Sequence, residues 1–247
     1  MATSRLGAAM FACAIVTAAC DARAPAPAAS PALSGGSIEG RVRLRGPQPT
    51  PEPIRMGLDP ICLEVSGASP VNDTLVVSHD GFVANAFVYV EDGLDRARAF
   101  PDATEPVQLV QRGCRFVPHV LGVRVGQPIE IVNDDPTEHN VHSLPGLNDE
   151  LSRLQPVQGM LETRTFASPE IMVRIKCDLH PWMTAFVGVV DHPYFAVTGE
   201  DGRFALTGVP DGTYTLAVWH ERFGTQTTRV TVAHGRRVDA DIELETE

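Results

Sequence analysis

The chain has 247 residues, of which 43% are hydrophobic and 21% are charged, as in a globular protein with a buried core and one or two domains. The 31 acidic and 20 basic side chains give a formal net charge of −11, the wrong sign for neutralising phosphates, which argues against nucleic acid as a partner. With 21 glycines and 20 prolines between short apolar stretches, the sequence predicts many short strands and an all-β fold.

Residues 1–19 have the pattern of a secretory signal peptide, in which Arg5 precedes an apolar run too short to span a bilayer. Small residues before Cys20 resemble a lipoprotein box, so either Cys20 is lipidated or the signal is simply cleaved. Asp21 resembles an inner-membrane retention signal, and we therefore expect a periplasmic protein that a lipid would anchor to that membrane. Residues 20–36 are rich in Ala, Pro, Ser and Gly, which predicts a flexible linker.

Three of the five cysteines, Cys62, Cys114 and Cys177, remain once the signal peptide and Cys20 are set aside. In an oxidising compartment the simplest pairing joins Cys62 to Cys114 in a disulfide and leaves Cys177 free. The alternative is that Cys62 and Cys114 are two buried free thiols.

The segment Ile171–Cys177 alternates in polarity, which predicts a strand whose inward-facing residues begin with Ile171 and end with Cys177. In the tight loop that follows, His180 and Met183 recur after Cys177 at three-residue intervals. A thiol, an imidazole and a thioether are thereby brought together at the end of a strand.

A second source of imidazole follows another predicted strand pair, Val123–Asn133, broken at Gly126. A short acidic turn, residues 134–138, follows it and leads to His139 and His142. Two His and one Cys with a weak axial Met form the blue-copper arrangement, in which thiolate and thioether favour Cu(I) and imidazole also suits Cu(II).

The stretch Val107–Val190 resembles the cupredoxins, and among them the amicyanins, because the short Cys-x-x-His-x-x-Met loop carries Pro181 directly after its His. The resemblance implies a Greek-key β-sandwich holding one type 1 copper. It gives His139, Cys177 and His180 as the equatorial ligands and Met183 as the axial ligand. It also implies that Asn140 steadies the ligand loop by hydrogen bonding.

The resemblance implies one-electron transfer outside the cytoplasm rather than enzymatic catalysis, with a periplasmic redox protein such as a c-type cytochrome or a dehydrogenase as partner. The edge of His180, between apolar neighbours, is the expected electron port. Two further histidines, His119 and His142, lie near the predicted site, where each could replace a ligand, bind a second ion or only hydrogen bond. We expect Trp182 and Trp219 to be packing residues.

Other metal sites fit the sequence less well. A zinc site would more often recruit a second Cys pair or a carboxylate, and the sequence has no Cys-x-x-Cys. It also has no Cys-x-x-Cys-His for covalent haem. The competing functions are a non-redox protein that stores, delivers or senses copper at the same residues, and a structural sandwich with an accidental ligand cluster.

The flanking segments resemble the two halves of a carboxypeptidase regulatory-like, or transthyretin-like, domain. Asp-Gly turns punctuate the hairpins of Tyr194–Leu244, and Ser37–Leu44 resembles the first half. We therefore predict a second sandwich of immunoglobulin or transthyretin type into which the cupredoxin unit is inserted, with two sequential domains as the alternative. The expected parts are residues 37–105 and 192–247 for this sandwich and 106–191 for the cupredoxin unit.

Overall fold

The computed structural model describes residues 35–48, 50–57, 59–67, 70–95 and 97–245. The predicted signal peptide and the Cys20 lipidation site lie outside these residues. In the described part the chain is all-β, as the sequence predicts, with one short helix, α1 (Pro60–Val65). The strands are β1 (Gly36–Arg45), β2 (Phe87–Asp92), β3 (Val107–Gln111), β4 (Phe116–Val117), β5 (Val120–Arg124), β6 (Ile129–Asn133), β7 (His139–Leu144), β8 (Leu151–Gln155), β9 (Leu161–Arg164), β10 (Glu170–Lys176), β11 (Thr184–Val190), β12 (Phe195–Val197), β13 (Arg203–Val209), β14 (Gly212–His220), β15 (Gly224–Val232), β16 (Arg237–Asp239) and β17 (Ile242–Glu245).

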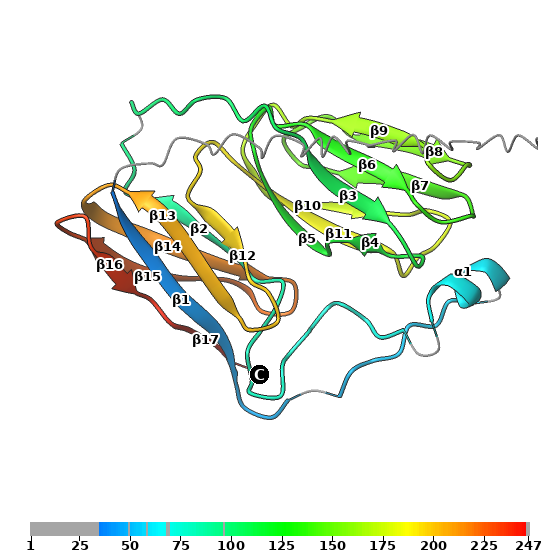
Figure 1. Ribbon diagram of the computed structural model, residues 1–247, viewed down its shortest axis with the longest axis horizontal. Helices are drawn as coiled ribbons and strands as arrows, with labels where there is room; N and C mark the ends of the chain where they lie inside the picture. The colour runs from blue at the N-terminus through cyan, green and yellow to red at the C-terminus, as the bar shows by residue number, and fades with distance from the viewer. Residues whose placement is uncertain (1–34, 49, 58, 68–69, 96, 246–247) are drawn as a thin grey trace, which may run out of the picture. The chain divides into compact units, whose positions relative to one another are not determined.

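Strands from both ends of the chain form what we call the flanking sandwich. One of its sheets has the order β13-β1-β16, with β17 also paired to β1, and the other has the order β12-β2-β14-β15. In Figure 1 the first strand, β1, lies beside the last strands, β16 and β17, with which it pairs in parallel. Ile38, Val88 and Leu216 belong to the single core that the two sheets enclose.

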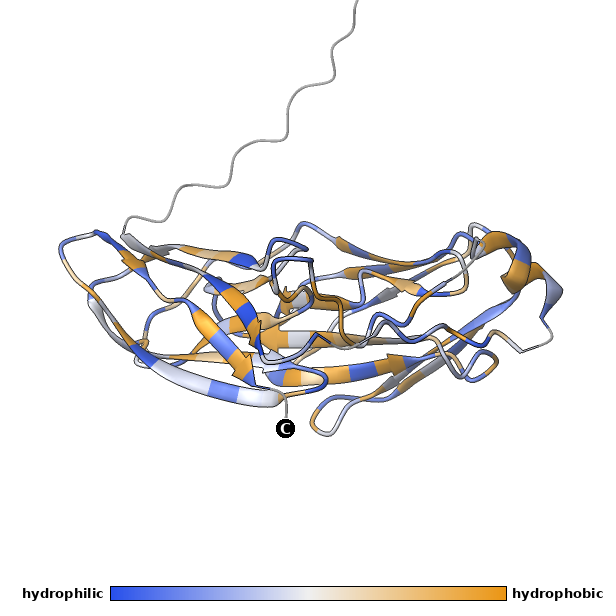
Figure 2. Cartoon of the chain, turned by 90° about the horizontal axis from the view of Figure 1, so that it is seen from below, coloured by the Kyte–Doolittle hydropathy of each residue, from blue (hydrophilic) through white to orange (hydrophobic). Residues whose placement is uncertain are grey.

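The middle of the chain forms the central sandwich, from the sheets β5-β11-β10-β7-β8 and β4-β3-β6-β9. Its core includes Leu109, Ile131 and Val187. In β6, Ile129 and Ile131 are buried while Glu130 between them is not, because successive side chains of a strand point to opposite faces. Figure 2 shows this alternation of apolar and polar residues along many of the strands.

The segment around α1 lies in sequence between two strands of the flanking sandwich but packs on the core of the central one. Met56 and Cys62 are buried in that core, and Ile54 and Val65 pack against it. Asp59 caps the helix, accepting hydrogen bonds from the N–H groups of its first turn, and Pro60 occupies the first helical position, where its missing N–H costs nothing. The alternation of apolar and polar residues along the strands does not predict this contact.

Strand β10 departs from the alternation predicted for it. Its pairing with β11 shifts register between Glu170 and Val173, and Met172 has a φ of 64°. The extra residue of such a bulge reverses which side chains face inward upstream of it. The prediction that Ile171 faces the core is therefore wrong, since it is 36% exposed, whereas Ile175 and Cys177 are buried as predicted.

Candidate metal centre

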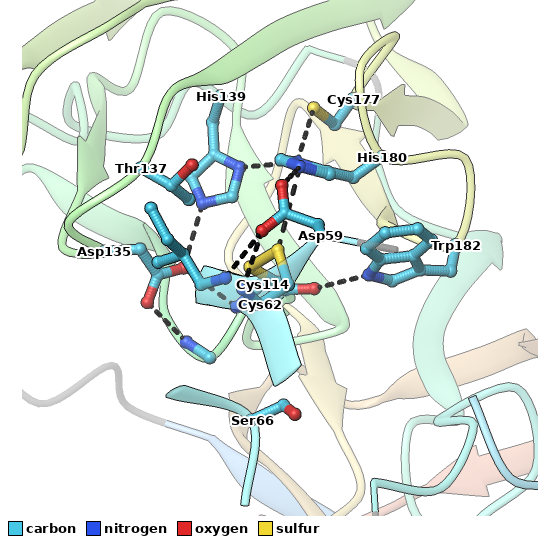
Figure 3. The surroundings of a disulfide bond; sticks show 12 residues. Asp59, Cys62, Ser66, Cys114, Asp135, Thr137, His139, Cys177, His180 and Trp182 are labelled. Carbon is cyan, nitrogen blue, oxygen red and sulfur yellow. Dashed lines mark hydrogen bonds and ion pairs between the residues drawn. A yellow bond between two sulfur atoms is a disulfide. The ribbon is translucent and has the colours of Figure 1, made fainter. Parts of the chain in front are cut away.

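Three of the predicted ligands converge at one end of the central sandwich. His139 is the first residue of β7, Cys177 follows β10, and His180 lies in the loop between β10 and β11. The two imidazoles face each other with their Nδ1 atoms 3.0 Å apart, and the Cys177 Sγ lies 3.7 Å from the His180 Nδ1 (Figure 3). The donor atoms of all three residues lie within 4.8 Å of one another.

The β10–β11 loop is held closed by its own backbone. The Cys177 N–H donates to the Met183 carbonyl oxygen at 3.2 Å, and the Met183 N–H donates to the His180 carbonyl oxygen at 2.9 Å. Met183, the predicted axial ligand, is completely buried in the core of the central sandwich. This tight loop brings three residues with ligating side chains to one end of two paired strands.

The Cys177 sulfur accepts a hydrogen bond from the Asn140 N–H at 3.3 Å. The Asn140 side chain accepts one from the Asp178 N–H, so this residue ties β7 to the Cys177 loop. Burial raises the pKa of the Cys177 thiol, but hydrogen bonds with His139, His180 and the Asn140 N–H outweigh it and lower the pKa to about 6. The thiolate, which is the form that binds metals, is therefore favoured at neutral pH.

His139 is completely buried and is oriented from its far side. Its Nε2 lies 2.9 Å from a carboxylate oxygen of Asp135, which leaves Nδ1 facing the site. Burial lowers the pKa of His139, but the hydrogen bonds and charges of Asp135 and Cys177 together outweigh it, and the pKa is raised. Asn133 accepts a hydrogen bond from the Asp135 N–H and donates to two carbonyls, which fixes the β6–β7 turn.

His180 is oriented in the same way, but by a residue about 120 positions earlier in the chain. Its Nε2 lies 3.2 Å from the Asp59 carboxylate and 3.7 Å from the sulfur of Cys62. The prediction that the edge of His180 reaches the surface is wrong, because the residue is only 5% exposed. The α1 segment supplies the cover (Figure 3).

Cys62 and Cys114 form a disulfide beneath the two imidazoles, and Cys177 is free and buried. Trp182 donates a hydrogen bond from its indole N–H to the Cys114 carbonyl at 3.0 Å. Its ring centroid lies 5.1 Å from that of His180. Together the disulfide and the indole enclose the side of His180 that faces away from Cys177.

The two extra histidines lie apart from the converging donors. His119 hydrogen bonds to Glu221 at 2.7 Å and to the Thr184 carbonyl at 3.1 Å. His142, on the outer face of β7, lies between Asp178 and Glu150. Each of their ring nitrogens therefore has a hydrogen-bonding partner within the protein.

The donor set fits a copper ion. With bonds of the lengths known for zinc, ~2.0 Å to nitrogen and ~2.3 Å to sulfur, two nitrogens on one ion are at most ~4 Å apart, and a nitrogen and a sulfur at most ~4.3 Å. The 3.0 Å between the two Nδ1 atoms and the 3.7 Å from the Cys177 Sγ to the His180 Nδ1 lie inside both limits. A thiolate with two imidazoles suits both oxidation states of copper.

Residues 181–245 match the carboxypeptidase regulatory-like domain. This domain takes in most of the strands of the flanking sandwich, and the match begins inside the β10–β11 loop of the metal centre. It therefore includes β11, which pairs with β5 and β10 in the central sandwich. No curated protein matches the chain.

Several solved structures similar to this chain are copper proteins. A Cu-containing nitrite reductase from Thermus scotoductus SA-01 is 24% identical, with a TM-score of 0.31, over 40% of this chain, which spans only 25% of the reductase. A purple cupredoxin from Nitrosopumilus maritimus is 21% identical over 34% of this chain and 98% of its own, with a TM-score of 0.29. Amicyanin, as a point mutant in the Cu(I) state, is 21% identical over 42% of this chain and 98% of its own, with a TM-score of 0.31.

Among the described residues, no helix has both the length and the apolar character needed to cross a membrane.

Proposed function

We propose that the chain is an exported copper protein that carries single electrons between redox partners, with His139, Cys177 and His180 as ligands and Met183 as the axial ligand. The observation that carries this proposal is the convergence of a thiol and two imidazoles, each at most 5% exposed. Copper bound there would supply one-electron chemistry by alternating between Cu(I) and Cu(II).

The residues of the chain prepare the site for such a carrier. Asp135 and Asp59 hold the distal nitrogens of the two imidazoles, and the Asn140 N–H holds the sulfur of Cys177. Ligands fixed in this way need little rearrangement when the charge of a bound ion changes. Their burial keeps water from the donors.

Burial also favours a carrier over the competing function in copper storage or delivery. A protein that hands copper to an acceptor needs ligands that the acceptor can reach, whereas His139 and Cys177 are 0% and 2% exposed. We further propose that the protein works in the periplasm. It would either be anchored to the membrane by a lipid on Cys20 or be released after cleavage of the signal peptide. Its partner would be a c-type cytochrome or a dehydrogenase.

The test is the visible spectrum of the purified protein after Cu(II) is added. We expect an intense thiolate-to-copper band that ascorbate bleaches and an oxidant restores. Cys177→Ser should abolish the band because a hydroxyl cannot replace the thiolate as a charge-transfer donor.

Two histidines of the same strand provide a matched pair of variants. His139→Gln should lose the band, and His142→Gln should keep it, because the His142 ring is held by Asp178 and Glu150 outside the donor cluster. Copper bound without the band would favour copper handling instead. A band that survives in Cys177→Ser would contradict the ligand assignment.

A further inference from the structure

The carboxylate behind His139 is held by backbone amides as well as by the histidine. Asp135 is 2% exposed and accepts hydrogen bonds from the Gly113 N–H at 2.7 Å and the Cys114 N–H at 2.8 Å. A buried carboxylate with this set of donors remains ionised, because each donor stabilises its negative charge. The position of Asp135, and with it the orientation of His139, therefore depends on the turn that contains Cys114.

The carboxylate behind His180 is also held by backbone amides. One oxygen of Asp59 accepts from the Ile61 N–H at 3.0 Å and the Cys62 N–H at 2.9 Å. The other oxygen lies 3.2 Å from the His180 Nε2. The orientation of His180 therefore depends on the turn that contains Cys62.

The disulfide joins these two turns directly. Cys62 and Cys114 each donate a backbone N–H to one of the two carboxylates, and their side chains form the S–S bond. Without that bond, the described contacts that hold the α1 segment near the site would be its packing, the Asp59 contact and, a few residues after the helix, the ion pair of Asp73 with Arg115. The disulfide thus fixes the distance between the two turns. Because each turn holds one carboxylate, it fixes the positions of both carboxylates (Figure 3).

We infer that the Cys62–Cys114 disulfide, with Asp59 and Asp135, is a positioning unit that holds both site histidines, His139 and His180, from their distal nitrogens. This inference rests on the proposed function, because a positioned imidazole matters only where it binds a metal. An imidazole whose distal N–H is held by a carboxylate is a more basic ligand. The unit therefore favours Cu(II) over Cu(I) and lowers the reduction potential of the centre.

The same residues do not form a second metal site while the disulfide is intact. Asp59, Cys62 and His180 lie close together, as do Cys114, Asp135 and His139, but each group includes a sulfur already used in the S–S bond. These groups are therefore explained as support for the imidazoles rather than as ligands of another ion.

The first test uses the metal-free protein and the NMR signals of the imidazole nitrogens in mildly alkaline buffer. In the wild type, the Nε2 of each site histidine should carry a proton, because each faces a carboxylate. Asp59→Asn should change the Nε2 signal of His180 and leave the Nε2 signal of His139, which Asp135 holds, close to its wild-type position. Cys62→Ala combined with Cys114→Ala should perturb both histidines, because both turns are then released. Unchanged signals in the double variant would overturn the inference.

The second test measures the affinity for Cu(II) and Cu(I) and the reduction potential of the copper-loaded protein. Asp59→Asn is the sharpest variant, because Asn caps helices as well as Asp does and should preserve α1. Losing the carboxylate should weaken Cu(II) binding roughly tenfold, weaken Cu(I) binding less, and raise the potential. A potential unchanged from that of the wild type would contradict the inference.

The matched control is Asp211→Asn. Asp211 also accepts two backbone N–H bonds, from His234 and Gly235, but it belongs to the flanking sandwich. It should leave the potential and both affinities unchanged. If the wild type gives no thiolate-to-copper band while the NMR signals behave as expected, the proposed function fails and the positioning unit stands.

Discussion

His220, at the end of β14, is a buried histidine away from the metal centre. It is 1% exposed, and its Nδ1 accepts a hydrogen bond from the Arg222 N–H at 3.2 Å, so its proton resides on Nε2. Among the described residues, that Nε2 has no hydrogen-bonding partner. Burial disfavours the charged ring and lowers the pKa of His220 from 6.5 to about 4.

This lowered pKa predicts a loss of stability in acid. Between pH 6.5 and about 4 the unfolded chain binds a proton at His220 that the folded chain excludes, so the free energy of unfolding falls as the pH falls. The loss amounts to about 3 kcal/mol at 1.36 kcal/mol per pKa unit. Denaturant unfolding at several pH values measures this loss. The free energy of unfolding should fall less steeply with falling pH in His220→Gln than in the wild type.

The control removes an exposed histidine instead. His79→Gln, in a turn where the side chain is open to solvent, should keep the wild-type dependence on pH. If His220→Gln and the wild type lose stability in parallel over this range, the explanation in terms of burial is wrong.

At the residue scale, the sequence predicts the donors better than their surroundings. Cys177 and His180 could be found because their spacing along one short loop is itself the signal. The burial of His180 could not, because its cover comes from Asp59 and Cys62, far away in the sequence and close only in the fold. The pair Asp59-Pro60 does carry a signal for a helix start, but that signal does not reveal what lies against the carboxylate.

At the scale of elements, two paired glycines create a flat area on the sheet that bears the metal loop. Gly122 of β5 lies opposite Gly188 of β11. A Cβ on Gly188 would lie 2.6 Å from the ring of Phe87, and a Cβ on Gly122 would lie 2.5 Å from the ring of Phe195. The two aromatic rings of the flanking sandwich therefore pack where the sheet has no side chains.

We expect Gly188→Ala to destabilise the protein by ~1–3 kcal/mol, the usual cost of overpacking a filled site. Denaturant unfolding would measure this loss, and Phe87→Leu in the same chain should recover part of it by making room. Gly199→Ala is the control, because a Cβ there meets only an Asp201 oxygen at 3.8 Å. Equal stability of the two alanine variants would contradict the packing described here.

The sequence predicted most of the strands but not the bulge in β10. Alternation is a local property, and it correctly placed Val173 and Ile175 inside. The shift between Glu170 and Val173 depends on the pairing with β11, which sequence periodicity alone does not report. The bulge therefore appears only when the neighbouring strand is known.

At the scale of the whole molecule, we propose that the central sandwich is an insert between the two parts of the flanking one. This predicts the result of limited proteolysis between Asp95 and Glu105, which lie in the connection that follows β2. The two fragments should stay together without denaturant, because β1 pairs with β13, β16 and β17. On a denaturing gel they should separate only after reduction, since the Cys62–Cys114 bond crosses the cut.

Two sequential domains would give a different pattern. Release of a stable folded fragment beginning near His192 would contradict the insert. An uncut Cys62→Ala, Cys114→Ala variant serves as the control for folding, and its cut form should separate on a denaturing gel without reductant.

The pairing of β1 with the last strands also has a consequence for synthesis. Val42 pairs with Ile242 and Arg45 with Glu245, so β1 leaves the ribosome about 200 residues before its parallel partner. Contacts so distant in sequence form late, after the local hairpins. Until then the edge of β1 at residues 42–45 lacks its β17 partner, and an open strand edge is the kind of surface that recruits other chains. Chains that end before β17 should therefore aggregate more readily than the full chain, even though every proposed metal ligand is already present.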